Sequence, residues 1–226
     1  MTKILLIIVM QVIFLNLQAQ ISGLSASKTT TLSATVVNKN SIEYEPSISL
    51  INNENNFEKS FSWRFTYGLL NNFEIGFSVS SSSDLMGVGA KFLFLNSDLV
   101  KVASICGVNF NFIEKNPFDN AGLGFVTTFD YTKNFSSDFD FHFMTNFCDN
   151  KIISFGFDNG LFVGATQIII GTNYIYYAQE QKSQFIVNQG VTLEAAKNFL
   201  IVATVSLEAL RQRTYGFGLA LTIKLD

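Results

Sequence analysis

The sequence is poor in charged residues, proline, cysteine and histidine. Charged side chains make up 15% of its 226 residues, against roughly 25% in an average soluble protein. Two cysteines are too few for a disulfide-stapled scaffold. Because acidic residues outnumber basic ones, 18 to 15, a nucleic-acid-binding protein is disfavoured. Phenylalanine, in contrast, occurs 24 times, which excludes a disordered chain, since such chains are poor in aromatic residues.

The N-terminus has the pattern of a targeting segment. Lys3 is followed by two apolar runs, residues 4–9 and 12–15, and then by the small residue Ala19. This order is typical of a secretory signal peptide, which we expect to comprise residues 1–19 and to direct export through the general secretory pathway. An uncleaved membrane anchor is the alternative, and the Asn and Gln residues after the apolar run argue against it.

One later stretch, residues 159–179, carries no charge and is long enough to be tested as a membrane helix. It contains three glycines, and its middle, Gly164-Ala165-Thr166-Gln167, is typical of a turn. Each half is as long as a strand and rich in Ile, Val, Phe and Tyr, so we predict two strands joined by a turn.

Alternation with a period of two runs through the rest of the chain, as in Phe61, Trp63, Phe65 and Tyr67. Successive side chains of a strand point to opposite faces, so this pattern predicts strands with one apolar and one polar face. No helical segment separates them, so neighbours should pair antiparallel. The expected strands cover about 41–51, 60–67, 73–80, 85–95, 99–112, 122–132, 138–147, 151–163, 167–178, 184–194, 199–208 and 215–225.

Charged residues of these strands gather in the polar phase. This phase also contains many small residues, Gly, Ser, Thr and Asn, whereas a soluble surface would carry more Lys and Glu. The thirteen charges are Glu43, Glu45, Arg64, Glu74, Lys91, Lys101, Asp130, Asp138, Asp140, Asp158, Glu194, Glu208 and Lys224.

A soluble β-sandwich or lipocalin also alternates, but its apolar face points inward. Small residues suit a crowded interior, and aromatic residues end the apolar phase of several strands, as at Tyr131, Phe147 and Tyr215. Outer-membrane barrels carry such aromatic girdles around an apolar outer band. We therefore predict an all-β fold, a transmembrane antiparallel up-and-down β-barrel of about 12 strands formed by residues 41–226. Residues 20–40 would be a periplasmic tail or a plug, and the protein would reside in the bacterial outer membrane.

The two ends of the predicted barrel differ in their connections. If both chain termini are periplasmic, the periplasmic turns are short, and the two longest loops, near 52–59 and 113–121, face outward. Cys106 falls in the outward phase and Cys148 opens a loop, so we expect two free thiols.

Residues 62–76 carry a more specific pattern. Arg64 is followed by an aromatic-Gly-Leu turn at 67–69, a polar pair and Glu74 between apolar residues. This pattern resembles the strand-turn-strand core of a bacterial outer-membrane family labelled as transporters or as "MetA pathway of phenol degradation" proteins. Residues 31–43 are similar to the segment that leads into that family's first strand. The resemblance implies an outer-membrane barrel that passes small, often aromatic or hydrophobic compounds, although the end at Leu225-Asp226 departs from the terminal aromatic common in barrels.

Motifs for catalysis or metal binding are weak. His142 shares a face with Asp140, but no spacing marks a serine nucleophile, so we interpret it as a hydrogen-bonding residue of the lumen rather than part of a hydrolase. Asp138 and Asp140 could contribute to a calcium site, but calcium takes six to eight oxygens from a compact loop. The pair Gly87 and Gly89 lacks the helix and Lys of a phosphate loop. We therefore expect no enzyme activity, no cofactor and no metal site.

The inward phase defines the predicted lumen. We expect its opposite charges to pair across the lumen and narrow it, and its apolar members, such as Phe162 and Tyr177, to suit a small hydrophobic solute. The predicted function is passive transport of small hydrophobic or aromatic solutes, and the alternative is a non-conducting structural or interaction barrel. The expected partners are outer-membrane lipid, the barrel-assembly machinery and a small solute. The expected lumen-lining residues are Arg64, Glu74, Lys91, Lys101, Asp130, Asp140, His142, Asp158, Phe162, Tyr177, Glu194, Glu208 and Lys224.

Overall fold

The computed structural model describes residues 24, 31–53, 56–81, 85–111, 118–147, 151–209 and 214–225. The predicted signal peptide, residues 1–19, lies outside these ranges. Within them, no helix has the length and apolar character needed to cross a membrane.

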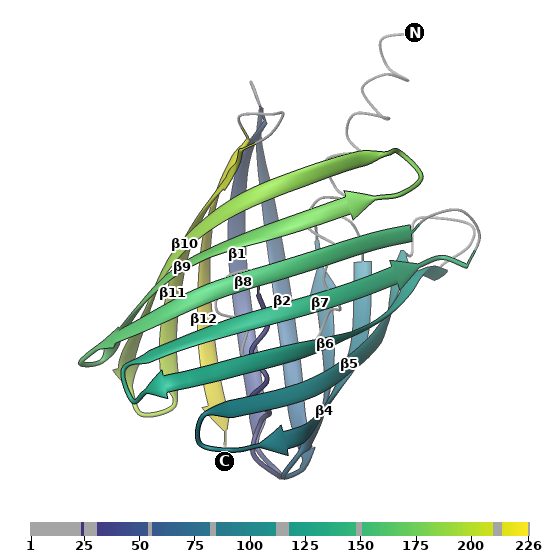
Figure 1. Cartoon of the computed structure of the whole chain (residues 1–226). Coiled ribbons are helices and arrows are strands. Elements are labelled where there is room, and N and C mark those ends of the chain that lie inside the picture. The colour runs from purple at the N-terminus through teal and green to yellow at the C-terminus, as the bar shows by residue number, and fades with distance from the viewer. Residues whose placement is uncertain are drawn as a thin grey trace, which may run out of the picture.

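The described residues form twelve strands that pair in sequence order around a closed barrel (Figure 1). All pairings are antiparallel, and β1 closes the barrel against β12. The fold class predicted from alternation is therefore confirmed. The strands are β1 Ile42–Asn53, β2 Asn56–Leu70, β3 Phe73–Ser80, β4 Leu85–Asn96, β5 Val100–Asn111, β6 Phe118–Thr132, β7 Phe135–Thr145, β8 Lys151–Val163, β9 Thr166–Tyr177, β10 Lys182–Ala196, β11 Phe199–Glu208 and β12 Tyr215–Leu225.

Several strands are longer than the alternation predicted. The strand expected at 60–67 runs from 56 to 70, and the one expected at 122–132 begins at 118. Their extra residues continue the antiparallel ladder, because Asn53 pairs with Asn56 and Asn109 with Asn120. Asn-rich segments at these strand ends are therefore part of the strands, because the neighbouring strand supplies hydrogen-bond partners for their backbone.

The two ends of the barrel differ, and we name them by their connections. At the turn end, hairpins close through short turns, such as Asn71-Asn72 and Gly164-Ala165. At the loop end, most connections are longer and include residues 146–150 and 209–214, but only two residues separate Asn53 of β1 from Asn56 of β2. The long loop expected near 52–59 therefore belongs largely to these two strands. The C-terminus lies at the turn end (Figure 1).

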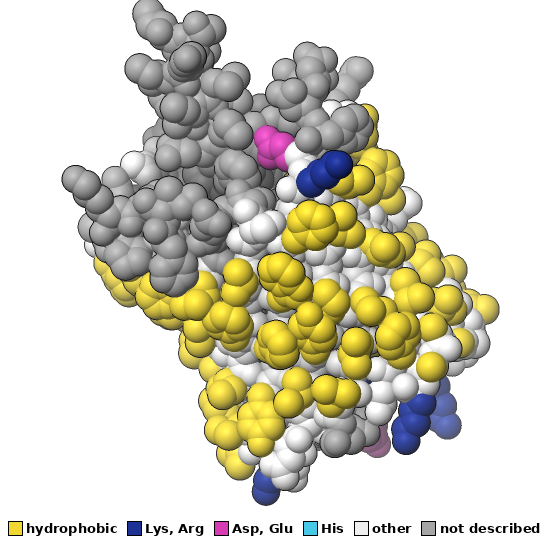
Figure 2. Space-filling view, turned by 180° about the vertical axis from the view of Figure 1, so that it is seen from behind, with side chains coloured by type: hydrophobic (Ala, Val, Ile, Leu, Met, Phe, Trp, Pro, Cys, Tyr) yellow, Lys and Arg dark blue, Asp and Glu magenta, His cyan; other side chains and the backbone are white. Residues whose placement is uncertain are grey.

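The alternation places apolar side chains on the outside of the barrel. In β9, Ile168 and Ile170 are exposed, whereas Ile169 and Ile175 are buried inside. Figure 2 shows the resulting apolar band, with charged side chains near the two ends. Among the described strand residues, three charges share the outward phase, and they lie at the loop end; these are Lys59, Asp119 and Lys151.

Aromatic residues gather where the band meets the two ends. At the turn end, Tyr131 is 53% exposed and stacks with Phe129 and Phe135. At the loop end, Phe118 stacks on Phe147. These clusters match the aromatic girdles that flank the apolar band of outer-membrane barrels.

The thiol of Cys106 is free and exposed on the outward face of β5. The other cysteine, Cys148, lies outside the described residues.

A segment that precedes β1, residues 31–38, runs inside the barrel (Figure 1). Its apolar side chains Leu32 and Ala34 are 2% and 0% exposed and belong to the same cluster as Val126 and Met144. The barrel is therefore filled in part by its own chain, and we call residues 31–38 the inner segment.

A tight reversal joins the inner segment to β1 at the turn end. Asn40 has a positive φ of 64°, which Asn tolerates better than most residues, and its N–H donates to Gly68 O at 2.7 Å. The N–H of Ser41 donates to Asn38 O at 3.0 Å. Any side chain at position 68 would collide with the backbone of Asn38, so a glycine is required there.

The outward position of Leu123, which is 60% exposed near the middle of β6, generates a stability prediction. Leu123→Arg should lower the free energy of unfolding by roughly 2–4 kcal/mol in lipid, because a charge on the lipid face is costly at mid-depth. The matched change Tyr131→Arg at the turn end should cost about 0–1 kcal/mol. Denaturant unfolding of the folded protein in lipid vesicles measures both. Equal losses of stability in the two variants would contradict the assignment of Leu123 to the middle of the apolar band.

Candidate functional site

The predicted lumen residues fall into three groups in the structure. A central group is fully buried and comprises Glu74, Lys91, Asp140, His142 and Asp158. Three of these, Glu74, Lys91 and Asp140, bond to the inner segment. A second group lines a cavity near the turn end; it comprises Arg64, Asp130, Phe162, Glu194 and Lys224. Lys101 lies outside this lining and binds Asp130. Two residues, Tyr177 and Glu208, lie near the loop end, at the ends of β9 and β11.

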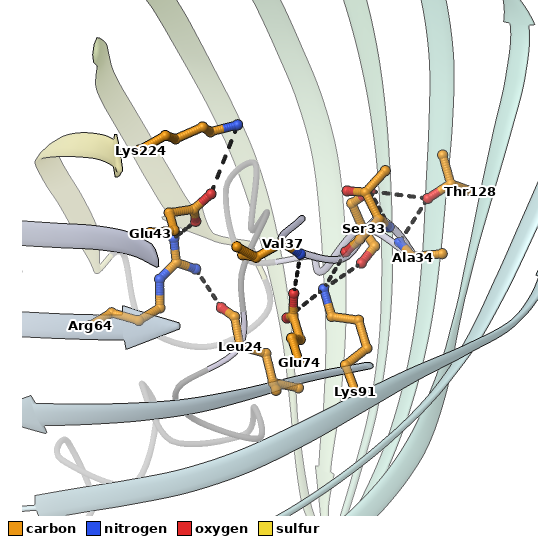
Figure 3. Close-up of polar contacts among 11 residues, drawn as sticks. Leu24, Ser33, Ala34, Val37, Glu43, Arg64, Glu74, Lys91, Thr128 and Lys224 are labelled. Atoms are coloured by element: carbon orange, nitrogen blue, oxygen red, sulfur yellow. Dashed lines mark hydrogen bonds and ion pairs between the residues drawn. The ribbon is translucent and has the colours of Figure 1, made fainter. Parts of the chain in front are cut away.

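The central group contains a fully buried ion pair. Glu74 of β3 and Lys91 of β4 are register partners, and Lys91 Nζ lies 3.1 Å from Glu74 Oε1, with both side chains 0% exposed. Such a pair is tolerated in a low dielectric only when its remaining polar atoms are also satisfied. The inner segment supplies those partners, as Figure 3 shows. Val37 N–H donates to Glu74 Oε2 at 2.7 Å, and Lys91 donates to Ser33 O at 3.1 Å and Thr35 O at 2.7 Å.

A second set of wall contacts holds the other half of the inner segment. Leu32 N–H donates to Asp140 Oδ2 at 2.7 Å, and Ala34 N–H donates to Thr128 Oγ1 at 2.8 Å. The Thr128 hydroxyl in turn donates to Asp138 Oδ1 at 2.5 Å. Wall carboxylates and a hydroxyl therefore take the place of a neighbouring strand for the N–H groups of this segment.

Acidic residues are concentrated on β7 and β8 inside the barrel. Asp138 and Asp158 are register partners, and both are 0% exposed. Asp140 Oδ2 lies 3.3 Å from His142 Nε2, also with both side chains at 0%. In the described ranges no group of three His, Cys, Asp or Glu residues has an arrangement that could hold a metal ion.

The prediction of charge pairing across the lumen is wrong for the described residues. The pairs join neighbouring strands: Glu43 and Glu45 of β1 bind Arg64 of β2 at 2.9 and 2.8 Å, and Lys101 of β5 binds Asp130 of β6 at 2.6 Å. Adjacent strands lie about 4.8 Å apart, so a charged side chain reaches a partner on the next strand directly. The inner segment, rather than an ion pair, crosses the interior.

Three residues of the 62–76 pattern contact the chain that precedes β1. Arg64 donates to Leu24 O at 2.5 Å, Gly68 accepts the N–H of Asn40, and Glu74 accepts that of Val37. The spacing in that pattern thus matches a set of contacts to the N-terminal part of the chain.

A cavity of about 340 Å³ lies near the turn end, between the inner segment and the barrel wall. Its charged lining is mixed: Glu43 and Arg64 are paired, whereas Lys224 reaches Glu43 only at 3.9 Å. The lining residues are Ser33, Thr35, Glu43, Glu45, Arg64, Thr128, Asp130, Ser136, Phe162, Gly164, Ala165, Gln167, Thr192, Glu194, Leu200, Val202, Thr222 and Lys224.

Strand register brings one wall of this cavity together. Phe162 of β8 pairs with Gln167 of β9, Gln167 with Thr192 of β10, and Thr192 with Val202 of β11. These four residues form a row of inward side chains over four strands.

The closing seam forms another part of the wall. In the β1–β12 ladder no partner is assigned to Glu45 or Pro46, and Pro46 has no N–H to donate. A side-chain bond bridges this gap, because Thr222 Oγ1 donates to Glu45 Oε2 at 2.6 Å.

Sequence reasoning did not single out Gln167, Thr192, Leu200, Val202 and Thr222. The period of two places each in the inward phase, so a signal existed. Uncharged residues of this phase occur in every strand, and only the register and the position of the inner segment distinguish those that face the cavity.

An acyl-hydrolase role for His142 requires a serine within hydrogen-bond reach of its imidazole. Neither of its ring nitrogens has a hydrogen-bond partner among the described residues, and its imidazole is 0% exposed. The described structure therefore assembles no serine–histidine pair at this residue.

Comparison with solved structures shows that the fold is that of outer-membrane β-barrel channels. The NanC porin matches with a TM-score of 0.65 at 8% identity, over 80% of this chain and 100% of that one. The KdgM porin matches with 0.61 at 12% identity, over 81% and 98%. The COG4313 outer membrane channel from Pseudomonas putida F1 matches with 0.61 at 9% identity, over 85% and 98%. No family model and no curated protein matches the chain, so the phenol-degradation label stays a prediction.

The buried Glu74–Lys91 pair generates a second stability prediction. Glu74→Gln alone should lower the free energy of unfolding by roughly 3–5 kcal/mol, because it leaves a buried ammonium without its carboxylate. The double change Glu74→Leu with Lys91→Met should recover only part of this loss, because it removes the unpaired ammonium but leaves the N–H of Val37 and the C=O of Thr35 without these partners. Urea unfolding in detergent micelles measures both variants. A double variant as unstable as the single one would show that the ion pair is not the reason.

Proposed function

We propose that this protein is a passive channel of the outer membrane for small solutes with a hydrophobic or aromatic part. The observation that carries the proposal is the inverted polarity of the barrel, with apolar side chains outside and a polar interior that contains a cavity. Closure leaves no unpaired sheet edge, as a spanning barrel in lipid requires. An apolar band flanked by aromatic clusters supports placement in that membrane.

The net negative charge of the cavity wall bears on which class of solute the channel would accept. Inward strand positions carry more carboxylates than cationic groups, because Glu43, Glu45, Asp130 and Glu194 share the cavity with only Arg64 and Lys224. A potential of this sign concentrates cations and repels polyanions. One solved structure of the similar KdgM porin is described as a complex with oligogalacturonate, an acidic oligosaccharide. We infer that this chain takes a different class of solute.

Some apolar side chains of the inward phase line the cavity, and only these support the proposal of a hydrophobic or aromatic solute. Phe162 is 40% exposed and lines the cavity beside Leu200 and Val202. By contrast, Ile105 and Tyr177, which are 3% and 5% exposed, belong to the buried cluster that includes the inner segment. The cavity, rather than that cluster, offers the apolar surface a solute can touch.

A non-conducting structural barrel is the second candidate. It is favoured by one observation, which is that the inner segment runs inside the barrel and joins a buried apolar cluster with residues of the wall. The two candidates differ in whether ions and solutes cross.

A bilayer experiment separates them. Purified full-length mature protein in planar bilayers should give discrete current steps that favour K⁺ over Cl⁻, because carboxylates prevail on the cavity wall. Neutral 2-phenylethanol added on the turn-end side should reduce this current by resting against Phe162. Conductance and reversal potential in a KCl gradient are the measurements.

Phe162→Ser should weaken the block by 2-phenylethanol, whereas Phe157→Ser, on the outward face of β8, should leave it unchanged. Absence of any current above the lipid background would reject the channel and leave the structural barrel.

The inner segment generates a separate prediction. Deletion of residues 31–37 should raise single-channel conductance several-fold, because these residues occupy the interior and hold Glu74, Lys91 and Asp140. Circular dichroism and the heat-dependent shift on a gel should show that the barrel is retained. An unchanged conductance in a folded deletion variant would place the ion path away from this segment.

A further inference from the structure

We propose that the turn-end cavity is a binding site for a small zwitterion with an apolar side chain, such as an aromatic or aliphatic α-amino acid. The inference deepens the proposed channel function by naming the class of solute at that same cavity. It depends on three features that the described residues give to one small cavity: hydrogen-bond donors without partners, side chains of both charges that are weakly paired or unpaired, and an apolar wall.

Two hydrogen-bond donors at the cavity have no partner among the described residues. Gln167 is 8% exposed, and its Nε2 is buried with no acceptor. Arg64 Nε is likewise buried without a partner, although the other two nitrogens of the guanidinium bind Leu24, Glu43 and Glu45. A buried donor without an acceptor is energetically unfavourable. Both donors therefore favour a ligand with an acceptor group such as a carboxylate.

A cationic side chain at the cavity is also only weakly engaged. Lys224 Nζ is 3.9 Å from Glu43 Oε2, its side chain is 47% exposed, and Glu43 binds Arg64 more closely, at 2.9 Å. Its ammonium can therefore turn to a ligand carboxylate at little cost.

A carboxylate, whose charge is opposite to that of Lys224, lines the same cavity. Glu194 of β10 is exposed, and its side chain makes no ion pair or hydrogen bond with the described part of the chain. The register relates it to Lys224: Glu194 pairs with Leu200, Leu200 with Thr222, and Lys224 follows two residues later on the same face of β12. Glu194 and Lys224 thus lie on either side of β11, where a ligand ammonium can meet Glu194 and a ligand carboxylate can meet Lys224.

The remaining wall suits a compact apolar side chain. Phe162, Leu200 and Val202 supply aromatic and aliphatic surface to the cavity. The volume of about 340 Å³ is near the lower limit of ordinary ligand pockets, which begin at roughly 300 Å³. A monomeric amino acid matches this size, whereas an oligosaccharide does not.

Three probes that share one aromatic body test the assignment: L-phenylalanine, which has both charges, 2-phenylethylamine, which has only the ammonium, and 3-phenylpropanoate, which has only the carboxylate. Isothermal titration of the full mature protein in detergent micelles should show L-phenylalanine binding about tenfold more tightly than either single-charge probe. Tighter or equal binding of the amine would make the cavity a cation site, tighter or equal binding of the acid would make it an anion site, and no binding of any probe would remove the site. Each of these three outcomes overturns the proposal.

Two neutralising variants assign the charges. Glu194→Gln should weaken L-phenylalanine and 2-phenylethylamine about tenfold and leave 3-phenylpropanoate unchanged, and Lys224→Met should weaken L-phenylalanine and 3-phenylpropanoate instead. The matched controls are Glu180→Gln and Lys182→Met, which alter an exposed pair at the loop end, 2.7 Å apart. Losses equal to those of the controls would overturn the assignment.

Micelles have no second compartment, so this binding test is independent of conduction. A protein that binds the zwitterion but gives no current would keep the site and lose the channel. A protein that conducts without binding the zwitterion would keep the channel and lose the site.

Discussion

Backbone pairing in a medium without water is the constraint on which the rest of this structure depends. A strand that crosses lipid must give each N–H and C=O a partner within the protein, and a sheet achieves this only by closing on itself. The β1–β12 ladder provides that closure, and it brings Glu43 of the first strand beside Lys224 of the last. The seam is weakest near Pro46, where the hydrogen bond from Thr222 to Glu45 joins the two strands through side chains. Closure therefore builds part of the cavity wall as well as the barrel.

Closure of the barrel also determines where charged side chains are located. Side chains that alternate outward must be apolar, so ionisable residues of the strands accumulate inside, where their desolvation is expensive. The structure reduces this cost in two ways. Adjacent strands pair opposite charges, as in Glu74 with Lys91, and the inner segment contributes backbone groups to the atoms that remain. The N–H groups of Leu32, Ala34 and Val37 in the inner segment in turn bind side chains of the wall. Wall and inner segment therefore stabilise one another.

The fold shared with the NanC, KdgM and COG4313 barrels leaves the chemistry of the interior open, because those chains share only 8–12% identity with this one. The interior of this chain holds the inner segment and a cavity lined by charges of both signs. Phe162, Glu194 and Lys224 line this cavity together with Ser33 and Thr35 of the inner segment. The selectivity of the proposed channel would then be set at the cavity and its rate at the inner segment.

Alternation by itself determined the strands, their order and the inward phase, because a period of two is a local property and hairpin neighbours follow from short connections. It also placed Arg64, Glu74 and Lys91 on the face that became buried. It did not determine which inward residues meet: the phase gives a side chain's face but not its distance from others, so pairing across the lumen was expected where pairing along the wall was found. The inner segment has no such periodicity, and its path was decided only when distant strands supplied partners for its backbone. The cavity, too, exists only in the tertiary structure, because it needs the register of five strands and the closure of the barrel to bring Gln167, Glu194 and Lys224 around one space.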